Sequence, residues 1–89
     1  MKLHWDPGKN QKLLEERGIT FEVIEQVIAT EGFLELLDHP TRENQKLLTL
    51  RLGEYVYVVP CVLEPNGDLF LKTAFPSRKY KRKYDRGQN

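Results

Sequence analysis

The sequence predicts an α+β domain in which two N-terminal helices and one basic C-terminal helix pack on a small antiparallel sheet of three to five strands. Three observations predict this fold class. Two segments with helical periodicity come first, three segments with strand-like patterns follow with short turns between them, and a segment rich in Lys and Arg comes last. A chain of 89 residues is long enough for one modest core, so residues 1–89 are expected to form a single domain.

The N-terminal segment predicts a short strand followed by a helix. Apolar and polar residues alternate over residues 2–5, which indicates a strand with one buried face, and Trp5 is expected to anchor the core. Asp6 followed by Pro7 is typical of a helix N-cap and first helical residue, and Gly18 is typical of a helix end.

A second helix is predicted from Thr20, which can cap it, to about Gly32. This is expected to be a core helix, because apolar side chains recur at helical spacing at Phe21, Ile24, Val27 and Ile28. Residues 33–37 form a short apolar run that could either finish this helix or begin the sheet. Residues 39–44 are polar and include a proline, which indicates a loop.

Three strands are predicted at residues 46–52, 55–63 and 69–75. The connections between them are too short to cross over between parallel neighbours, so the strands should be antiparallel. Residues 65–67, Pro-Asn-Gly, are a hairpin signal, because Asn and Gly accept positive φ at little cost. Pro60 cannot donate a ladder hydrogen bond, which predicts a bulge.

The C-terminal segment predicts a basic helix. Ser77 can cap it after Pro76 ends the last strand. Seven of the fourteen Lys and Arg residues lie between Lys72 and Arg86, against the single acid Asp85. Such a segment indicates a polyanionic partner, although basic helices on small proteins are often only solvated surfaces.

The charge is unevenly distributed along the chain. Residues 1–45 contain five basic and nine acidic residues, a net charge of −4, whereas residues 46–89 contain nine basic and four acidic residues, a net charge of +5. The total is only +1, so a contact with nucleic acid must depend on a local patch.

Several classes of protein and site are not predicted. Cys61 is the only cysteine, so no internal disulfide is expected, and a cytoplasmic location is expected because no signal-peptide core or membrane-spanning run is present. We find no clustered metal-ligand motif, no glycine-rich phosphate loop and no local triad, so no metal or cofactor is expected. His4 and His39 are expected at the surface or in a loop.

Four stretches of the chain form a recognisable combination: Trp5-Asp6 with Lys9 and Asn10, Arg17-Gly18-Ile19 leading to Phe21-Glu22, residues 55–59 and residues 71–79. Taken together, these stretches resemble the BrnT-like family of bacterial toxin-antitoxin toxins over nearly the whole chain. The resemblance implies a fold similar to the RelE-type ribonuclease toxins, RNA cleavage that blocks translation, and neutralisation by a small DNA-binding antitoxin encoded alongside. The chain departs from the better-known members at residues 73–79, which leaves open which basic residue is the functional arginine.

Metal-independent RNA cleavage needs a proton acceptor, a proton donor and cations around the phosphate. The residues predicted to take part in catalysis are Lys72, Arg78 and Tyr84, and those predicted to bind RNA are Lys46, Arg51, Lys79, Tyr80, Lys81 and Arg82. The cations are expected to border one surface of the sheet and to converge on one phosphate.

The role of two of the candidates depends on their surroundings. Nearby cations would favour the phenolate form of Tyr84, although Tyr80 and Tyr84 could equally pack a ring on the sheet. Lys72 lies on a predicted strand, where either a functional role or an edge position would explain its charge.

Two functions follow from the sequence. One is a toxin that cleaves mRNA and inhibits translation. The other is a non-catalytic module that binds nucleic acid or protein and regulates through a repressor partner.

Overall fold

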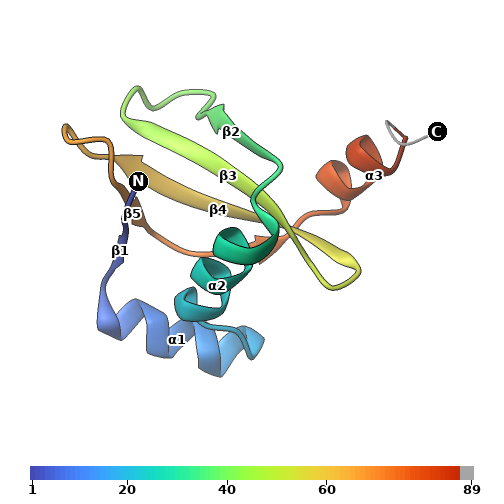
Figure 1. Ribbon diagram of the computed structural model, residues 1–89, viewed down its shortest axis with the longest axis horizontal. Coiled ribbons are helices and arrows are strands. Elements are labelled where there is room, and N and C mark those ends of the chain that lie inside the picture. Colours follow the sequence, from blue (N-terminus) through green and yellow to red (C-terminus); the bar gives the residue numbers. More distant parts are fainter. Residues whose placement is uncertain (87–89) are drawn as a thin grey trace.

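The computed structural model describes residues 1–86 and contains three helices and six strands in that part of the chain (Figure 1). In chain order the elements are β1 (Leu3–Trp5), α1 (Pro7–Arg17), α2 (Phe21–Glu31), β2 (Glu35–Asp38), β3 (Gln45–Leu52), β4 (Tyr55–Leu63), β5 (Leu69–Leu71), β6 (Phe75–Pro76) and α3 (Arg78–Arg86). The predicted α+β class and its three helices are therefore confirmed, and the ambiguous run at residues 33–37 contributes mainly to a strand.

The sheet is mixed, with the strand order β1-β5-β4-β3-β2 and β6 paired to β4. β1 and β5 are parallel, while the other pairs are antiparallel. The prediction of a purely antiparallel sheet is wrong at β1, because the long stretch of chain between β1 and β5 permits either direction. The six strands also exceed the predicted three to five.

The predicted caps form at both N-terminal helices. The Asp6 carboxylate accepts a hydrogen bond from the backbone N–H of Lys9 at 3.0 Å, and Gly18 ends α1 with φ 72°. Thr20 caps α2 by accepting a hydrogen bond from the backbone N–H of Val23 at 3.2 Å. These local signals set where both helices begin and where α1 ends.

The core lies between the sheet and the pair α1 and α2, which lie together in Figure 1 while α3 stands apart. We call the sheet surface under α1 and α2 the helix face. Its buried side chains include Leu48, Leu50, Val59, Cys61, Leu69 and Leu71, and they pack with Leu13, Phe21 and Ile24 of the helices. Burial of these apolar groups is the main contribution to stability that the fold provides.

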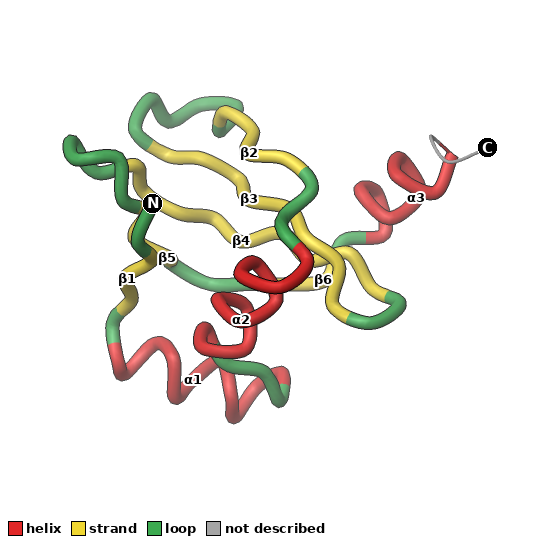
Figure 2. Tube along the Cα trace, in the orientation of Figure 1, coloured by secondary structure: helices red, strands yellow, loops and turns green. Residues whose placement is uncertain are grey.

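The last predicted strand, residues 69–75, is interrupted by the loop between β5 and β6 (Figure 2). Cys61 pairs with Leu71 and Val58 with Phe75, so two residues of β4 oppose three residues of the loop. The extra residue of this loop lies opposite Pro60. Pro60 itself keeps a regular pairing with β3. The irregularity predicted at Pro60 therefore occurs in the neighbouring segment rather than in β4.

The opposite surface of the sheet carries α3, and we call it the α3 face. In the register, Glu35, Thr49 and Val58 are on neighbouring strands and point to this face, as does Arg51 two residues after Thr49. Ser77 starts α3: its hydroxyl accepts from the backbone N–H of Tyr80 at 3.3 Å. Among residues 1–86, no helix is both long enough and apolar enough to span a membrane.

Candidate functional site on the terminal helix

A chain of hydrogen bonds joins α3 to the sheet through Tyr84. The Tyr84 hydroxyl donates to Glu35 Oε1 at 2.6 Å and lies 2.8 Å from Thr49 Oγ1. Lys83 Nζ lies 3.1 Å from the same Glu35 oxygen. Thr49 is fully buried, and Glu35 is on the neighbouring strand, so the phenol meets a pair of groups that the β2–β3 register holds in place.

A second polar group lies on the α3 face, two residues along β3 from Thr49. Arg51 Nη2 donates to Asp85 Oδ1 at 3.1 Å, and Lys81 Nζ donates to Asp85 Oδ2 at 2.7 Å. Together with Glu35, Tyr84 and Lys83, these residues form what we call the α3 site: Glu35, Thr49, Arg51, Lys81, Lys83, Tyr84 and Asp85. It contains two carboxylates, a phenol and three cations on one part of the surface.

The charge states in the α3 site follow from these contacts. Hydrogen bonds from Tyr84 and then Lys83 hold the pKa of Glu35 below its ordinary value, and hydrogen bonds from Lys81 and then Arg51 do the same for the pKa of Asp85. Burial, followed by the hydrogen bond to the Glu35 carboxylate, raises the pKa of Tyr84 to about 12. The expectation that cations favour the Tyr84 phenolate is wrong, because burial and the hydrogen bond to the Glu35 carboxylate both favour the neutral phenol.

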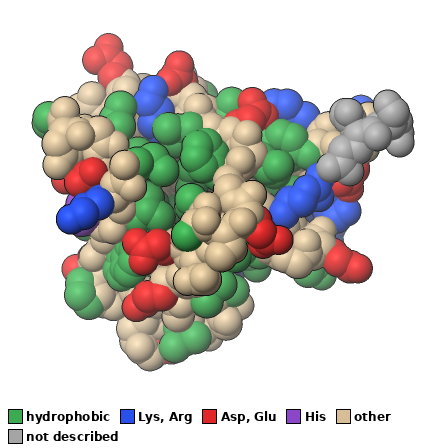
Figure 3. Space-filling view, in the orientation of Figure 1, with side chains coloured by type: hydrophobic (Ala, Val, Ile, Leu, Met, Phe, Trp, Pro, Cys, Tyr) green, Lys and Arg blue, Asp and Glu red, His purple; other side chains and the backbone are tan. Residues whose placement is uncertain are grey.

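The outward surface of α3 is cationic. Lys79, Arg82, Lys83 and Arg86 line a shallow hollow along the helix, and Arg78 is exposed at its start. Figure 3 shows Lys and Arg side chains gathered at this end of the molecule, with Asp and Glu beside them. The repeat of these cations at intervals of three and four residues suits contact with successive phosphates.

The rings of Tyr80 and Tyr84 stack with centroids 6.2 Å apart, and Lys83 Nζ lies 5.8 Å and 5.5 Å from their respective centroids. Both tyrosines are half-buried. The arrangement places flat rings beside cations, as the sequence predicted, and orients Tyr84 toward the sheet.

Two predicted site residues lie apart from α3. Lys72 follows β5, with its Nζ 5.5 Å from the Phe70 ring centroid, and it lines a hollow with Lys9 and Lys12 of α1 rather than with α3. Lys46 pairs in register with core residue Cys61, so it belongs to the helix face, where it forms an ion pair with Asp38. The prediction that all the cations border one surface is therefore wrong for Lys46, and Lys72 borders the hollow beside α1.

The sequence analysis missed the acidic members of the site. Glu35 lies in the ambiguous run at residues 33–37, where a single charge among apolar residues was the available signal. Its partner Tyr84 is 49 positions away, so no local pattern could pair them. Arg51 was predicted to bind RNA, and it is the strand cation that the structure brings to α3.

The raised pKa of Tyr84 predicts a measurable alkaline titration. Above the ordinary pKa of 10.0 the unfolded chain loses the phenolic proton, while the folded protein keeps it to about pH 12. The contribution of this neutral phenol to stability is complete below pH 10 and is lost as the pH rises toward 12. In an absorbance titration of the phenolate band, Tyr84→Phe should remove a component near pH 12; loss of a component near 10 instead would contradict the burial of the hydroxyl.

A helical pair on one side of a mixed sheet and a basic terminal helix on the other define an α+β fold of the kind seen in a ribonuclease toxin. The crystal structure of the Brucella abortus ribonuclease toxin BrnT superposes on this chain with a TM-score of 0.65, at 18% sequence identity, over 86% of this chain and 96% of that one. The chain has a BrnT-like fold, as the resemblance implied. No family model matches the sequence, and the search of curated proteins found no match.

Proposed function

We propose that the protein is the toxin of a bacterial toxin-antitoxin system, a metal-independent endoribonuclease that cleaves mRNA and thereby inhibits translation. The likeness of the fold to a ribonuclease toxin supports this proposal. The observation that carries it is the 2.6 Å contact between a neutral Tyr84 hydroxyl and an ionised Glu35 carboxylate, set among Arg51, Lys81 and Lys83.

The proposed reaction is attack by a ribose 2′-hydroxyl on the adjacent phosphate. The 2′-oxygen forms a bond to phosphorus, and the bond from phosphorus to the 5′-oxygen breaks. Glu35 accepts the proton from the 2′-hydroxyl. Tyr84, which keeps its proton at neutral pH, exchanges its hydrogen bond to Glu35 for one to the leaving 5′-oxygen and donates its proton there. Arg51, Lys81 and Lys83 offset the charge that builds up on the phosphate.

The remaining predicted residues contact the RNA strand at different distances from the cleaved phosphate in this proposal. Arg78, Lys79, Tyr80 and Arg82 bind the RNA strand on either side of the cleaved phosphate, because they lie on α3 beside Tyr84. Lys72 was predicted to be catalytic, but it lies beside α1. In this proposal it contacts the far end of the bound RNA strand. Replacement of Lys72 by alanine is a direct check, and we expect a smaller loss of cleavage than for Arg51→Ala.

The proposed partner is a cognate antitoxin, a small DNA-binding repressor encoded beside this protein. Induced expression should stop growth and degrade transcripts, and co-expression of the adjacent gene should restore both. Purified protein should cleave RNA in the presence of a chelator. If RNA is bound in a salt-dependent manner but remains whole, the protein is the non-catalytic binding module instead.

Removal of cations from the outward surface of α3 should weaken RNA binding. For Lys79→Ala combined with Arg82→Ala, we expect the slope of log affinity against log salt concentration to fall by about 0.7 for each phosphate contact removed. Arg42→Ala is the matched control, because this exposed arginine lies in the loop between β2 and β3 and lines a different hollow. Equal effects of the control and the double variant would contradict a binding site on α3.

A further inference from the structure

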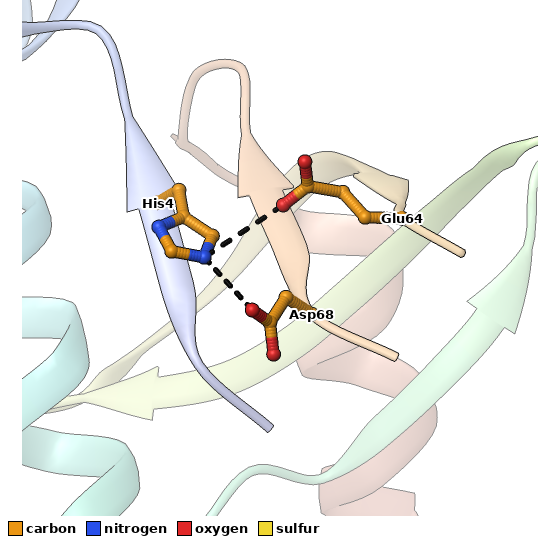
Figure 4. Close-up of side chains that lie close together, drawn as sticks. All are labelled: His4, Glu64 and Asp68. Carbon is orange, nitrogen blue, oxygen red and sulfur yellow. Dashed lines mark hydrogen bonds and ion pairs between the residues drawn. The ribbon is translucent and has the colours of Figure 1, made fainter. Parts of the chain in front are cut away.

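Three side chains with metal-ligating atoms meet beside β1 (Figure 4), and α3 lies at the other end of the molecule (Figure 1). His4 projects from β1, and Glu64 and Asp68 flank the turn between β4 and β5. His4 Nε2 lies 2.9 Å from Asp68 Oδ2 and 3.8 Å from Glu64 Oε1, and the three ligand atoms all lie within 4.8 Å of one another.

Hydrogen bonds hold Asp68 and the turn in place, and strand pairing places His4 beside them. The Asp68 carboxylate accepts hydrogen bonds from the Lys2 backbone N–H at 3.0 Å and from the Asn66 side chain at 3.1 Å, which orient Oδ2 toward His4. The turn is closed by the Glu64 backbone N–H, which donates to the Asp68 carbonyl at 2.8 Å. The parallel pairing of β1 with β5 sets His4 opposite Phe70, beside the turn.

One atom of the group lacks the partner that its chemistry requires. Glu64 Oε1 is closed off from solvent and has no hydrogen-bond donor among the described residues. The His4 ring nitrogen lies 3.8 Å from this oxygen, which is too far for a hydrogen bond. A carboxylate oxygen in this state needs a cation or a donor, and it points into the same space as the other two ligand atoms.

We propose that His4, Glu64 and Asp68 bind a divalent transition-metal ion, with Zn²⁺ as the preferred ion. One imidazole nitrogen and two carboxylate oxygens are a ligand set that Zn²⁺ accepts, at bond lengths of roughly 2.0–2.2 Å. Ligand atoms 2.9 Å and 3.8 Å apart need only small side-chain adjustments to surround an ion at those distances. The nitrogen ligand disfavours Mg²⁺ and Ca²⁺, which prefer oxygen ligands.

The ion would tie the N-terminal strand to the β4–β5 turn and neutralise the two carboxylates. Three protein ligands leave one coordination position for water. No short-range motif predicted this site, because His4 and Asp68 are 64 positions apart. Cys61 does not compete for the metal, because it is buried and the same burial raises the pKa of its thiol to about 11.

Calorimetric titration of the full-length, tag-free protein with ZnCl₂ tests the proposal. We expect one Zn²⁺ per chain, no binding of Mg²⁺, and a rise in Tm on addition of Zn²⁺. His4→Ala and Glu64→Gln should each weaken Zn²⁺ binding at least about tenfold and abolish the rise in Tm. If His4→Ala fails to fold, Glu64→Gln keeps the test valid, because it preserves the size of a partly exposed side chain.

His39→Ala is the matched control. The imidazole of His39 accepts hydrogen bonds from the Thr41 and Arg42 backbone N–H groups in the loop after β2, and His39 is not one of the three clustered ligands. Zn²⁺ binding by this variant should equal that of the wild type. Absence of Zn²⁺ binding in the wild type, unchanged binding in Glu64→Gln, or loss of binding in His39→Ala would each overturn the proposal.

Discussion

Replacement of Glu35 by glutamine is expected to reduce RNA cleavage by about 10²–10⁴-fold, the usual contribution of a positioned general base. Glutamine keeps the size of the side chain and can still accept the hydrogen bond from Tyr84, but it cannot take a proton from the 2′-hydroxyl. RNA affinity should change little, because the cations of α3 remain. Cleavage under single-turnover conditions, measured together with RNA binding, separates the two effects.

Asp38→Asn is the control for this experiment. Asp38 is on the same strand as Glu35, also forms an ion pair with a lysine, and lies on the helix face rather than on the α3 face. Its cleavage rate should match the wild type. If Glu35→Gln cleaves RNA at the wild-type rate, Glu35 takes no part in the reaction. Equal losses of cleavage in both variants would indicate a general effect of charge on β2.

Replacement of Phe21 by alanine should lower the free energy of unfolding by about 3–5 kcal/mol. Phe21 is fully buried, and its ring centroid lies 5.8 Å from that of Trp5 on β1. Its backbone N–H donates to the Asn10 side chain of α1 at 2.8 Å. The backbone of Phe21 thus joins α2 to α1, while its ring packs against β1 in the core. Removal of the ring leaves a cavity that these elements cannot all close.

Urea denaturation followed by circular dichroism measures this loss. Small domains have a total stability of about 5–15 kcal/mol, so the variant should unfold at much lower urea concentration. Val23→Ala on the same helix is the control: Val23 is 47% exposed, and its replacement should change stability by no more than about 0.5 kcal/mol. Similar losses for both variants would contradict the packing of α2 through Phe21.

Much of the fold could be predicted because its signals act over a few residues. Asp6, Thr20 and Ser77 cap the three helices, and the turn at residues 65–67 separates two strands, as expected from residue chemistry alone. The break between β5 and β6 could not be placed in the same way. The break depends on how β5 and β6 pair with β4. The proline is on β4, and the extra residue is in the segment between β5 and β6.

The candidate site was only half predictable. Its cations were evident because most of them are concentrated in one segment, and Arg51 was among the residues predicted to bind RNA. The acids of the site were not evident, because a carboxylate in a sequence gives no indication of which cation or phenol it will face. The charge state of Tyr84 was accordingly predicted in the wrong direction from the neighbouring lysines alone.

The sequence by itself determined the α+β class, the helix boundaries and the basic character of α3, since caps, periodicity and local charge depend on adjacent residues. Only the tertiary structure decided that β1 joins the sheet in parallel, that Tyr84 meets Glu35, and that His4 meets Asp68 and Glu64. These contacts bring together groups as many as 64 positions apart. Their geometry depends on strand order and register, which arise when the whole core packs.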